Sequence, residues 1–186
     1  MNDRTIARIL QIVFILFFIQ LNSCINNKLQ EDVERLMDTK LWFPTNSYND
    51  NIEFVILRYI KPTSCTSCEL EMGRWRVFRR QVENKYGGKV GIRFIIESKN
   101  TVEIKRIVSI YNFTDNTYVD SLGEFARNNV EINPFGKDVV MLLDEKKSVV
   151  AIGNPCKENR SNALYDRIIN SHQTDNENQP NNSLGL

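Results

Sequence analysis

The sequence has little of several residue types whose abundance would mark a special class of protein. Its 186 residues include only 8 Gly and 5 Pro, which excludes collagen and the Gly- and Pro-rich disordered chains. The 24 basic and 23 acidic residues leave a formal charge of +1, without the basic excess of a nucleic-acid-binding domain. What remains, 41% hydrophobic and 25% charged residues, is typical of one globular domain with its own core. We therefore expect no nucleic-acid partner.

Cysteine and histidine are also scarce. Four cysteines are too few for a disulfide scaffold, so each must be judged by its surroundings. A zinc site would need about two ligands besides Cys65 and Cys68, and only Cys156 and His172 remain, the latter in a tail that we expect to be disordered. The sequence therefore predicts no metal site and no cofactor.

An apolar run near the N-terminus has the make-up of an export signal. Arg4 and Arg8 precede this run, which covers residues 9–21. A basic stretch followed by an apolar core is typical of a secretory signal, and thirteen residues are short for a spanning helix, which needs about 20. The run ends in LNSC, which resembles the lipobox of bacterial lipoproteins and implies lipidation of Cys24. An uncleaved anchor helix running to about Ser23 is the alternative.

Apolar residues recur along most of the remaining chain with the spacing of strands and amphipathic helices. Apolar, β-branched runs predict strands at residues 53–60, 90–96, 117–120, 139–143 and 148–152, the last two as a hairpin. Helical spacing predicts helices at residues 28–41, 65–86, 104–111 and 164–169, with a helical turn at 122–126. This alternation implies a parallel sheet with helices packed on it, followed by the hairpin. The residues after 171 lack an apolar period and are expected to be disordered.

A Cys-x-x-Cys motif, Cys65 and Cys68, stands between the first of these strands and the helix that follows. Cys65 would lie where the chain turns into the helix, so the helix dipole and unpaired backbone N–H groups favour its thiolate. Cys68 would lie one turn further on and could attack a disulfide formed at Cys65. Such a motif beside a β-α-β pattern indicates a thioredoxin-like redox site, with half a zinc site or a structural remnant as alternatives.

The order of elements and the Cys-x-x-Cys motif together resemble the thioredoxin fold, and more closely the TlpA-like disulfide reductases among the bacterial envelope lipoproteins. The resemblance extends over about residues 42–171 and also rests on residues 118–125 (YVDSLGEF) and 139–153 (VVMLLDEKKSVVAIG). It implies an α/β fold of the thioredoxin-like, three-layer α/β/α type. It also implies that Cys65 is the nucleophile and Cys68 the resolving thiol.

Three positions depart from the pattern of that family. Thioredoxins usually carry a cis-proline just before the first hairpin strand, where its backbone receives an extended substrate, and here Asp138 takes that position. Lys137 and Asp138 are therefore the substrate-facing loop that the resemblance implies. The usual tryptophan before the first cysteine is Ser64, and the buried acid six residues before that cysteine falls on Tyr59.

These observations divide the chain into four expected segments: a lipoprotein signal peptide at 1–23, a tether and amphipathic helix at 24–41, a thioredoxin-like domain at 42–171 and a disordered tail at 172–186. The expected function is that of a membrane-tethered thiol-disulfide oxidoreductase acting on exported proteins. It would be held in the cell envelope by lipid on Cys24 and face the periplasm, a compartment where disulfides persist. The competing hypothesis is a non-catalytic thioredoxin-like binding module of an envelope lipoprotein.

Four side chains carry finer expectations. Trp75 shares a helical face with apolar neighbours and should be buried in the core. Cys65 should titrate below the free-thiol value of about 8.5, whereas Cys68 should be shielded by its helix. Cys156, left over after the other three cysteines are assigned, is expected to be a spectator.

Overall fold

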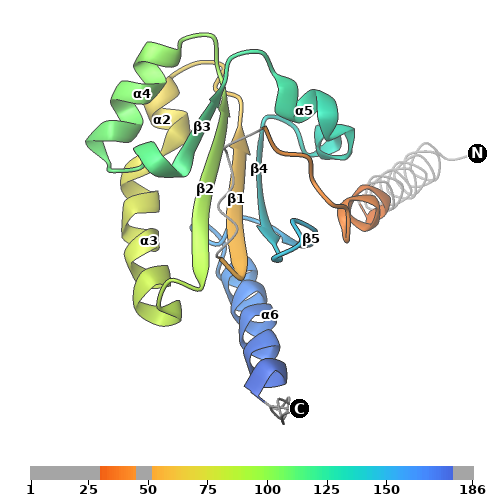
Figure 1. Cartoon of the computed structure of the whole chain (residues 1–186). Coiled ribbons are helices and arrows are strands. Elements are labelled where there is room, and N and C mark those ends of the chain that lie inside the picture. Colours follow the sequence, from red (N-terminus) through yellow and green to blue (C-terminus); the bar gives the residue numbers. More distant parts are fainter. Residues whose placement is uncertain (1–29, 45–51, 178–186) are drawn as a thin grey trace, which may run out of the picture. The chain divides into compact units, whose positions relative to one another are not determined.

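The protein is described by a computed structural model that covers residues 30–44 and 52–177 (Figure 1). The chain divides into two compact units, residues 1–36 and residues 37–186. The described part of the first unit is a helical stretch over residues 30–36. The predicted signal peptide and Cys24 lie outside the described residues. Within the described ranges, no helix combines the length and the apolar character that crossing a membrane requires.

The second unit is built on a mixed five-stranded sheet in the order β3-β2-β1-β4-β5. The strands are β1 (Phe54–Ile60), β2 (Val90–Glu97), β3 (Thr117–Asp120), β4 (Asp138–Leu143) and β5 (Val149–Ile152). β1 lies at the centre and pairs in parallel with β2 and antiparallel with β4. β3 extends the parallel side and β5 completes the antiparallel hairpin. The strands therefore lie where the sequence predicts them, to within one or two residues at each end.

Helices cover both faces of this sheet (Figure 1). They are α2 (Thr66–Leu70), α3 (Met72–Tyr86), α4 (Thr101–Ile110), α5 (Glu124–Asn128) and α6 (Asn159–Glu177), with 3-10 turns at Thr114–Asn116 and Val130–Phe135. α3, α4 and α6 pack into one core cluster with alternate residues of β1 and β2. α5 lies on the opposite face, where Phe125 contacts Tyr59 with ring centroids 5.6 Å apart.

Burial explains this arrangement. All seven residues of β1 are buried, as expected for a central strand covered on both faces. Trp75 on α3 is 0% exposed and meets Phe78 and Phe94 edge-to-face, with ring centroids 5.8 and 5.2 Å away. The predicted burial of Trp75 is therefore confirmed, and so is the thioredoxin-like α/β fold with helices on both sides of its sheet.

The helix predicted over residues 28–41 is shorter than expected, since the described helical residues end at Leu36. Asp38 has a φ of 62°, and the chain after it runs extended along β5. There the Asp38 and Leu41 backbone N–H groups donate to the carbonyls of Val149 and Lys147 at 2.8 and 3.0 Å. Pairing with a sheet edge thus replaces the last predicted helical turn.

The C-terminal helix is longer than expected. We predicted irregular chain after residue 171, but α6 continues to Glu177. His172, which we placed in a disordered tail, packs edge-to-face against Phe54 with ring centroids 5.2 Å apart. That contact places α6 against β1 beyond the last apolar repeat.

Candidate active site

Cys65 and Cys68 form a disulfide just beyond the carboxyl end of β1, with their Cα atoms 5.3 Å apart. Cys65 is the N-cap residue of α2 and Cys68 lies within that helix, as predicted. Both cysteines are exposed. The expectation that Cys68 is shielded is therefore wrong for the disulfide form, because α2 has only five residues and leaves its second cysteine uncovered.

The helix that carries Cys68 is separate from α3, contrary to the single helix that we predicted. Glu71 stands between them in the left-handed region, with φ 49° and ψ 34°. Its carboxylate lies 2.5 Å from the Lys157 ammonium and 3.4 Å from the Arg74 guanidinium. The dipole of the fifteen-residue α3 therefore begins at Met72 and not at Cys65.

Glu69 folds back to the start of α2. Its carboxylate accepts hydrogen bonds from the backbone N–H groups of Thr63 and Ser64, at 3.1 and 2.8 Å, and from the Ser64 hydroxyl at 2.5 Å. The bonds from Ser64 hold the pKa of this carboxyl below its usual range. These donors are consequently directed at Glu69, and a negative charge lies beside the segment that precedes Cys65.

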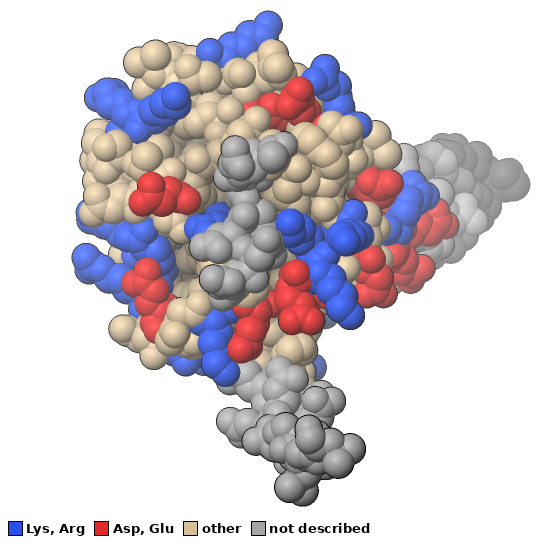
Figure 2. All heavy atoms as spheres, in the orientation of Figure 1, with Lys and Arg blue, Asp and Glu red and all other residues tan. Residues whose placement is uncertain are grey.

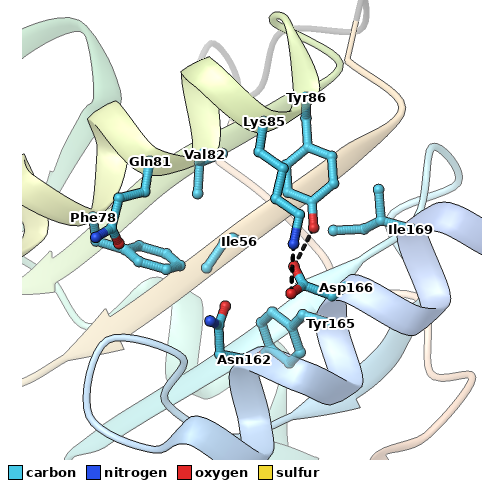
Figure 3. A pocket seen from close by; sticks show the side chains of 10 residues that line it. All are labelled: Ile56, Phe78, Gln81, Val82, Lys85, Tyr86, Asn162, Tyr165, Asp166 and Ile169. Carbon is cyan, nitrogen blue, oxygen red and sulfur yellow. Dashed lines mark hydrogen bonds and ion pairs between the residues drawn. The ribbon is translucent and has the colours of Figure 1, made fainter.

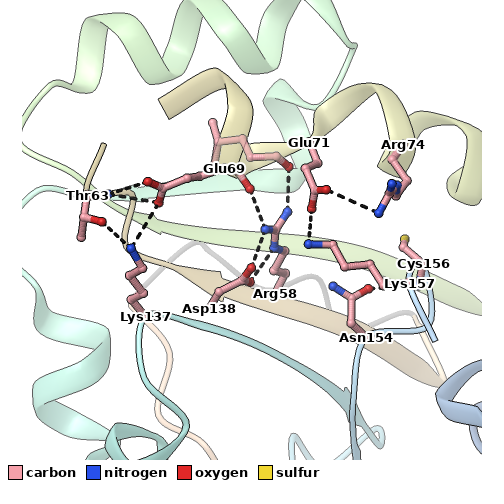
Figure 4. A network of polar contacts seen from close by, with 11 residues as sticks. Arg58, Thr63, Glu69, Glu71, Arg74, Lys137, Asp138, Asn154, Cys156 and Lys157 are labelled. Carbon is pink, nitrogen blue, oxygen red and sulfur yellow. Dashed lines mark hydrogen bonds and ion pairs between the residues drawn. The ribbon is translucent and has the colours of Figure 1, made fainter. Parts of the chain in front are cut away.

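Arg58 is the main site residue that the sequence analysis missed. This side chain of β1 is 0% exposed, and its guanidinium donates to both carboxylate oxygens of Asp138 at 2.8 Å. It also donates to the carbonyls of Leu70 and Glu69, at 2.7 and 2.8 Å (Figure 4). A charged residue within the apolar run EFVILRYI was the available signal, because buried charges need specific partners.

The Lys137–Asp138 segment is held by contacts within the chain. The Lys137 backbone carbonyl accepts a hydrogen bond from the Lys61 N–H at 2.7 Å. The Lys137 side-chain ammonium contacts the Thr63 hydroxyl and lies 4.0 Å from the Glu69 carboxylate. No cis peptide bond occurs within the described ranges, and Pro134 lies in the preceding 3-10 turn. Asp138 is the first residue of β4, which begins one residue earlier than predicted, and it binds Arg58 there.

Tyr59, at the position of the family's buried acid, lies on the other face of β1 from Arg58. Its hydroxyl donates to Glu97 at 2.6 Å, and Glu97 also pairs with Lys61 at 2.5 Å. Burial, followed by the hydrogen bond to Glu97, raises the pKa of Tyr59 above its ordinary value. The Tyr59 hydroxyl therefore stays protonated at neutral pH and donates to Glu97.

A cavity of about 310 Å³ lies beside the disulfide. Cys68 and Asp138 both line it, together with Ile60, Glu69, Glu71, Lys137 and Lys157. Its ionic groups pair with one another, Lys157 with Glu71 and Lys137 with Glu69. The arrangement offers an accessible disulfide bordered by fixed charges of both signs.

Cys156 precedes Lys157 but takes no part in the disulfide. Burial raises the pKa of its thiol to about 12. Such a thiol stays protonated at neutral pH and is a poor nucleophile, which agrees with the predicted spectator role. Within the part of the chain that the structure describes, no three His, Cys, Asp or Glu side chains gather closely enough to hold a metal ion.

The molecule also has a mixed distribution of surface charge and a second cavity. Acidic and basic side chains intermingle over the lower half of the face in Figure 2, while uncharged side chains predominate toward the top, where α2, α4 and α5 lie in Figure 1. A second cavity, of about 240 Å³, lies between α3 and α6 (Figure 3). None of the predicted site residues lines this second cavity.

Comparison with known proteins adds fold neighbours only. No family model matches the sequence, and a search of the curated proteins found no match. Solved structures similar to this chain include a thioredoxin-like protein in the oxidized form, with 16% identity over 71% of this chain and 93% of that one and a TM-score of 0.48. A thiol:disulfide interchange protein from Bacteroides sp. has 15% identity over 67% and 74% and a TM-score of 0.46.

A thioredoxin-like protein from Parabacteroides distasonis is similar at 11% identity, over 62% of this chain and 83% of that one, with a TM-score of 0.46. At such scores the assignment of the fold rests on the chain itself. The strand order, the antiparallel hairpin after a parallel β-α-β unit, and the Cys65–Cys68 disulfide after the central strand define a thioredoxin-like fold that carries a Cys-x-x-Cys disulfide.

Proposed function

We propose that this chain is a thiol-disulfide oxidoreductase that exchanges electrons with exported proteins through Cys65 and Cys68. The observation that carries the proposal is the exposed disulfide at the start of α2, at the end of the central strand. An exposed sulfur is open to attack by a thiolate of another protein, which is the first step of thiol-disulfide exchange.

The exchange balances without a cofactor. A thiolate of the partner attacks the Cys65 sulfur, the bond to Cys68 breaks, and its electron pair leaves on Cys68 as a thiolate. A second partner thiolate then attacks the mixed disulfide and releases Cys65. The partner leaves as a disulfide, and the Cys65–Cys68 pair has gained two electrons. The reverse sequence oxidises a partner dithiol.

The second candidate function is a non-catalytic binding module. It is favoured by the Lys137 carbonyl, which already accepts a hydrogen bond from the Lys61 N–H of the same chain. Equilibration of the full chain with glutathione buffers separates the two functions. An oxidoreductase shows a reversible two-electron transition and reduces insulin when dithiothreitol is supplied, and Cys65→Ser removes both properties while Cys156→Ser preserves them. A chain without a reversible transition is a binding module instead.

We also propose that the protein is tethered to a membrane of the cell envelope by lipid on Cys24 and faces the periplasm. The support is sequence alone: the basic start, the apolar run and the LNSC ending. Diacyl addition together with N-acylation attaches more than one fatty acyl group to Cys24, which is enough for stable membrane anchoring. Labelling with radioactive palmitate should mark the wild-type chain and not Cys24→Ser, which should accumulate as precursor. Equal labelling of the two chains contradicts the tether.

A further inference from the structure

Arg58 is a fully buried cation on the central strand of the sheet. Four of its five N–H groups donate, two to the Asp138 carboxylate and one each to the carbonyls of Leu70 and Glu69. Its guanidinium carbon also lies 5.6 Å from the ring centroid of Trp75. A buried charge costs free energy unless its partners are well placed, so this set of contacts fixes the relative positions of everything it touches.

The contacts of Arg58 connect the end of the disulfide-bearing helix to the start of β4. The carbonyls of Glu69 and Leu70 are the last two of α2, and Asp138 is the first residue of β4. Lys137, the residue before β4, contacts Thr63 and Glu69 on the other side of the motif. The segment that opens β4 therefore contacts the chain before α2 and the last turn of α2, directly through Lys137 and indirectly through Arg58 (Figure 4).

We propose that Arg58 is the positioning residue of the Cys65–Cys68 couple, and that the Arg58–Asp138 pair sets how readily the disulfide is reduced. The inference rests on the proposed function. Reduction leaves a negative charge on Cys68, the residue immediately before the two whose carbonyls Arg58 binds. Asp138 lines the same cavity as Cys68 and places the opposing charge there.

The two members of the pair consequently act with opposite sign. The guanidinium stabilises the thiolate and favours the reduced state, whereas the carboxylate destabilises the thiolate and favours the disulfide. Removing one charge leaves the other uncompensated. Loss of the cation should disfavour reduction, and loss of the anion should favour it.

The test measures the equilibrium constant of the full chain with glutathione for Arg58→Met and Asp138→Asn. Arg58→Met should lower the constant for reduction at least about tenfold, which corresponds to about 30 mV. Asp138→Asn keeps the shape of the side chain and should raise the equilibrium constant for reduction. It should also let the Cys68 thiol alkylate at lower pH. Exposed charges of the same types, changed in Arg80→Met and Asp115→Asn, serve as matched controls and should leave the constant unchanged.

Opposite shifts support the assignment, because general loosening of α2 would move both variants in the same direction. Shifts of the same sign, or no shift in either folded variant, overturn it. Where circular dichroism shows that Arg58→Met does not fold, Asp138→Asn decides alone, and an unchanged or lowered constant overturns the assignment. If the wild-type chain shows no reversible transition between disulfide and dithiol in the glutathione buffers, the proposed function is overturned, and this inference with it.

Discussion

Two charged clusters, each built around an aspartate, join a helix to a distant segment in this molecule. One is the Arg58–Asp138 pair beside the disulfide. The other lies between α3 and α6, where Asp166 accepts from the Tyr86 hydroxyl and pairs with Lys85 at 2.6 Å (Figure 3). In both, partners 80 residues apart in the sequence are held together by one carboxylate.

The two clusters differ in burial and in what they touch. The difference in burial lies in the cations, since the Arg58 side chain is 0% exposed and that of Lys85 is 48% exposed, whereas the side chains of Asp138 and Asp166 are similarly exposed at 33% and 28%. The first cluster binds the backbone of the disulfide-bearing helix, while the second only borders the cavity between two helices. Because the Lys85 side chain is exposed, water competes for its ion pair with Asp166. We therefore expect the second cluster to stabilise the fold only weakly and to leave the thiol chemistry unaffected.

The largest expected effect comes from Trp75, whose ring lies against the Arg58 guanidinium. Trp75→Ala should lower the free energy of unfolding by about 3–5 kcal/mol, the range for large aromatic deletions in cores. Denaturant unfolding of the full chain measures this loss. Val77→Ala, on the same helix but 56% exposed, is the matched control and should change stability by less than about 0.5 kcal/mol. Equal losses in both variants would contradict the burial of Trp75.

The second cluster should give a smaller effect. Asp166→Asn removes the ion pair with Lys85 and weakens the bond from Tyr86, and should cost about 1 kcal/mol because the site is partly exposed. The glutathione equilibrium constant should stay at the wild-type value. A redox shift as large as that of Asp138→Asn would remove the distinction between the two clusters.

Glu69 sharpens the comparison within the first region. Glu69→Gln removes the negative charge beside the segment before Cys65, so the reduced chain should alkylate at Cys65 roughly threefold faster at pH 7, as expected for one charge several Å away in water. Rates of iodoacetamide modification, mapped by peptide analysis, measure the change. Glu145→Gln, an exposed change in the hairpin turn, should have no effect. A slower reaction of Glu69→Gln would show that the carboxylate helps the thiolate through its hydrogen bonds.

The smallest expected effect is the alkylation of the Cys156 thiol in the native chain. The pKa of Cys156 in the folded chain, about 12, lies above the ordinary 9.0, so between these values the folded state keeps its proton while the unfolded state loses it, and stability falls as pH rises from about 9 to about 12. The oxidised native chain should therefore resist alkylation up to about pH 10 and react once unfolded in denaturant. Rapid modification of the native chain at pH 8 would contradict the burial of this thiol.

Local patterns explain why so much of the fold could be predicted. The strand limits follow from apolar runs such as residues 139–143, and the buried face of α3 follows from the steps between Met72, Trp75, Phe78 and Val82. The disulfide follows from a motif whose two cysteines are three residues apart. Each of these signals lies within one element of secondary structure.

The parts that escaped prediction depend on contacts between distant elements. Arg58 binds one partner 80 residues away and two backbone carbonyls, which have no signature in the sequence. Glu71 is not a glycine, so its left-handed conformation and the break between α2 and α3 could not be anticipated from residue type. The shortened helix near Leu36 likewise reflects pairing of the next residues with β5.

The distance along the chain between Arg58 and Asp138 has a consequence for the order in which the protein is made. A chain synthesised from its N-terminus presents Cys65 and Cys68 about 70 residues before Lys137 and Asp138 follow. Until β4 has been synthesised, Arg58 lacks Asp138 as its partner. The two cysteines then react as ordinary exposed thiols. If Arg58 and Asp138 act as proposed, the site acquires its redox character late, when β4 pairs with β1.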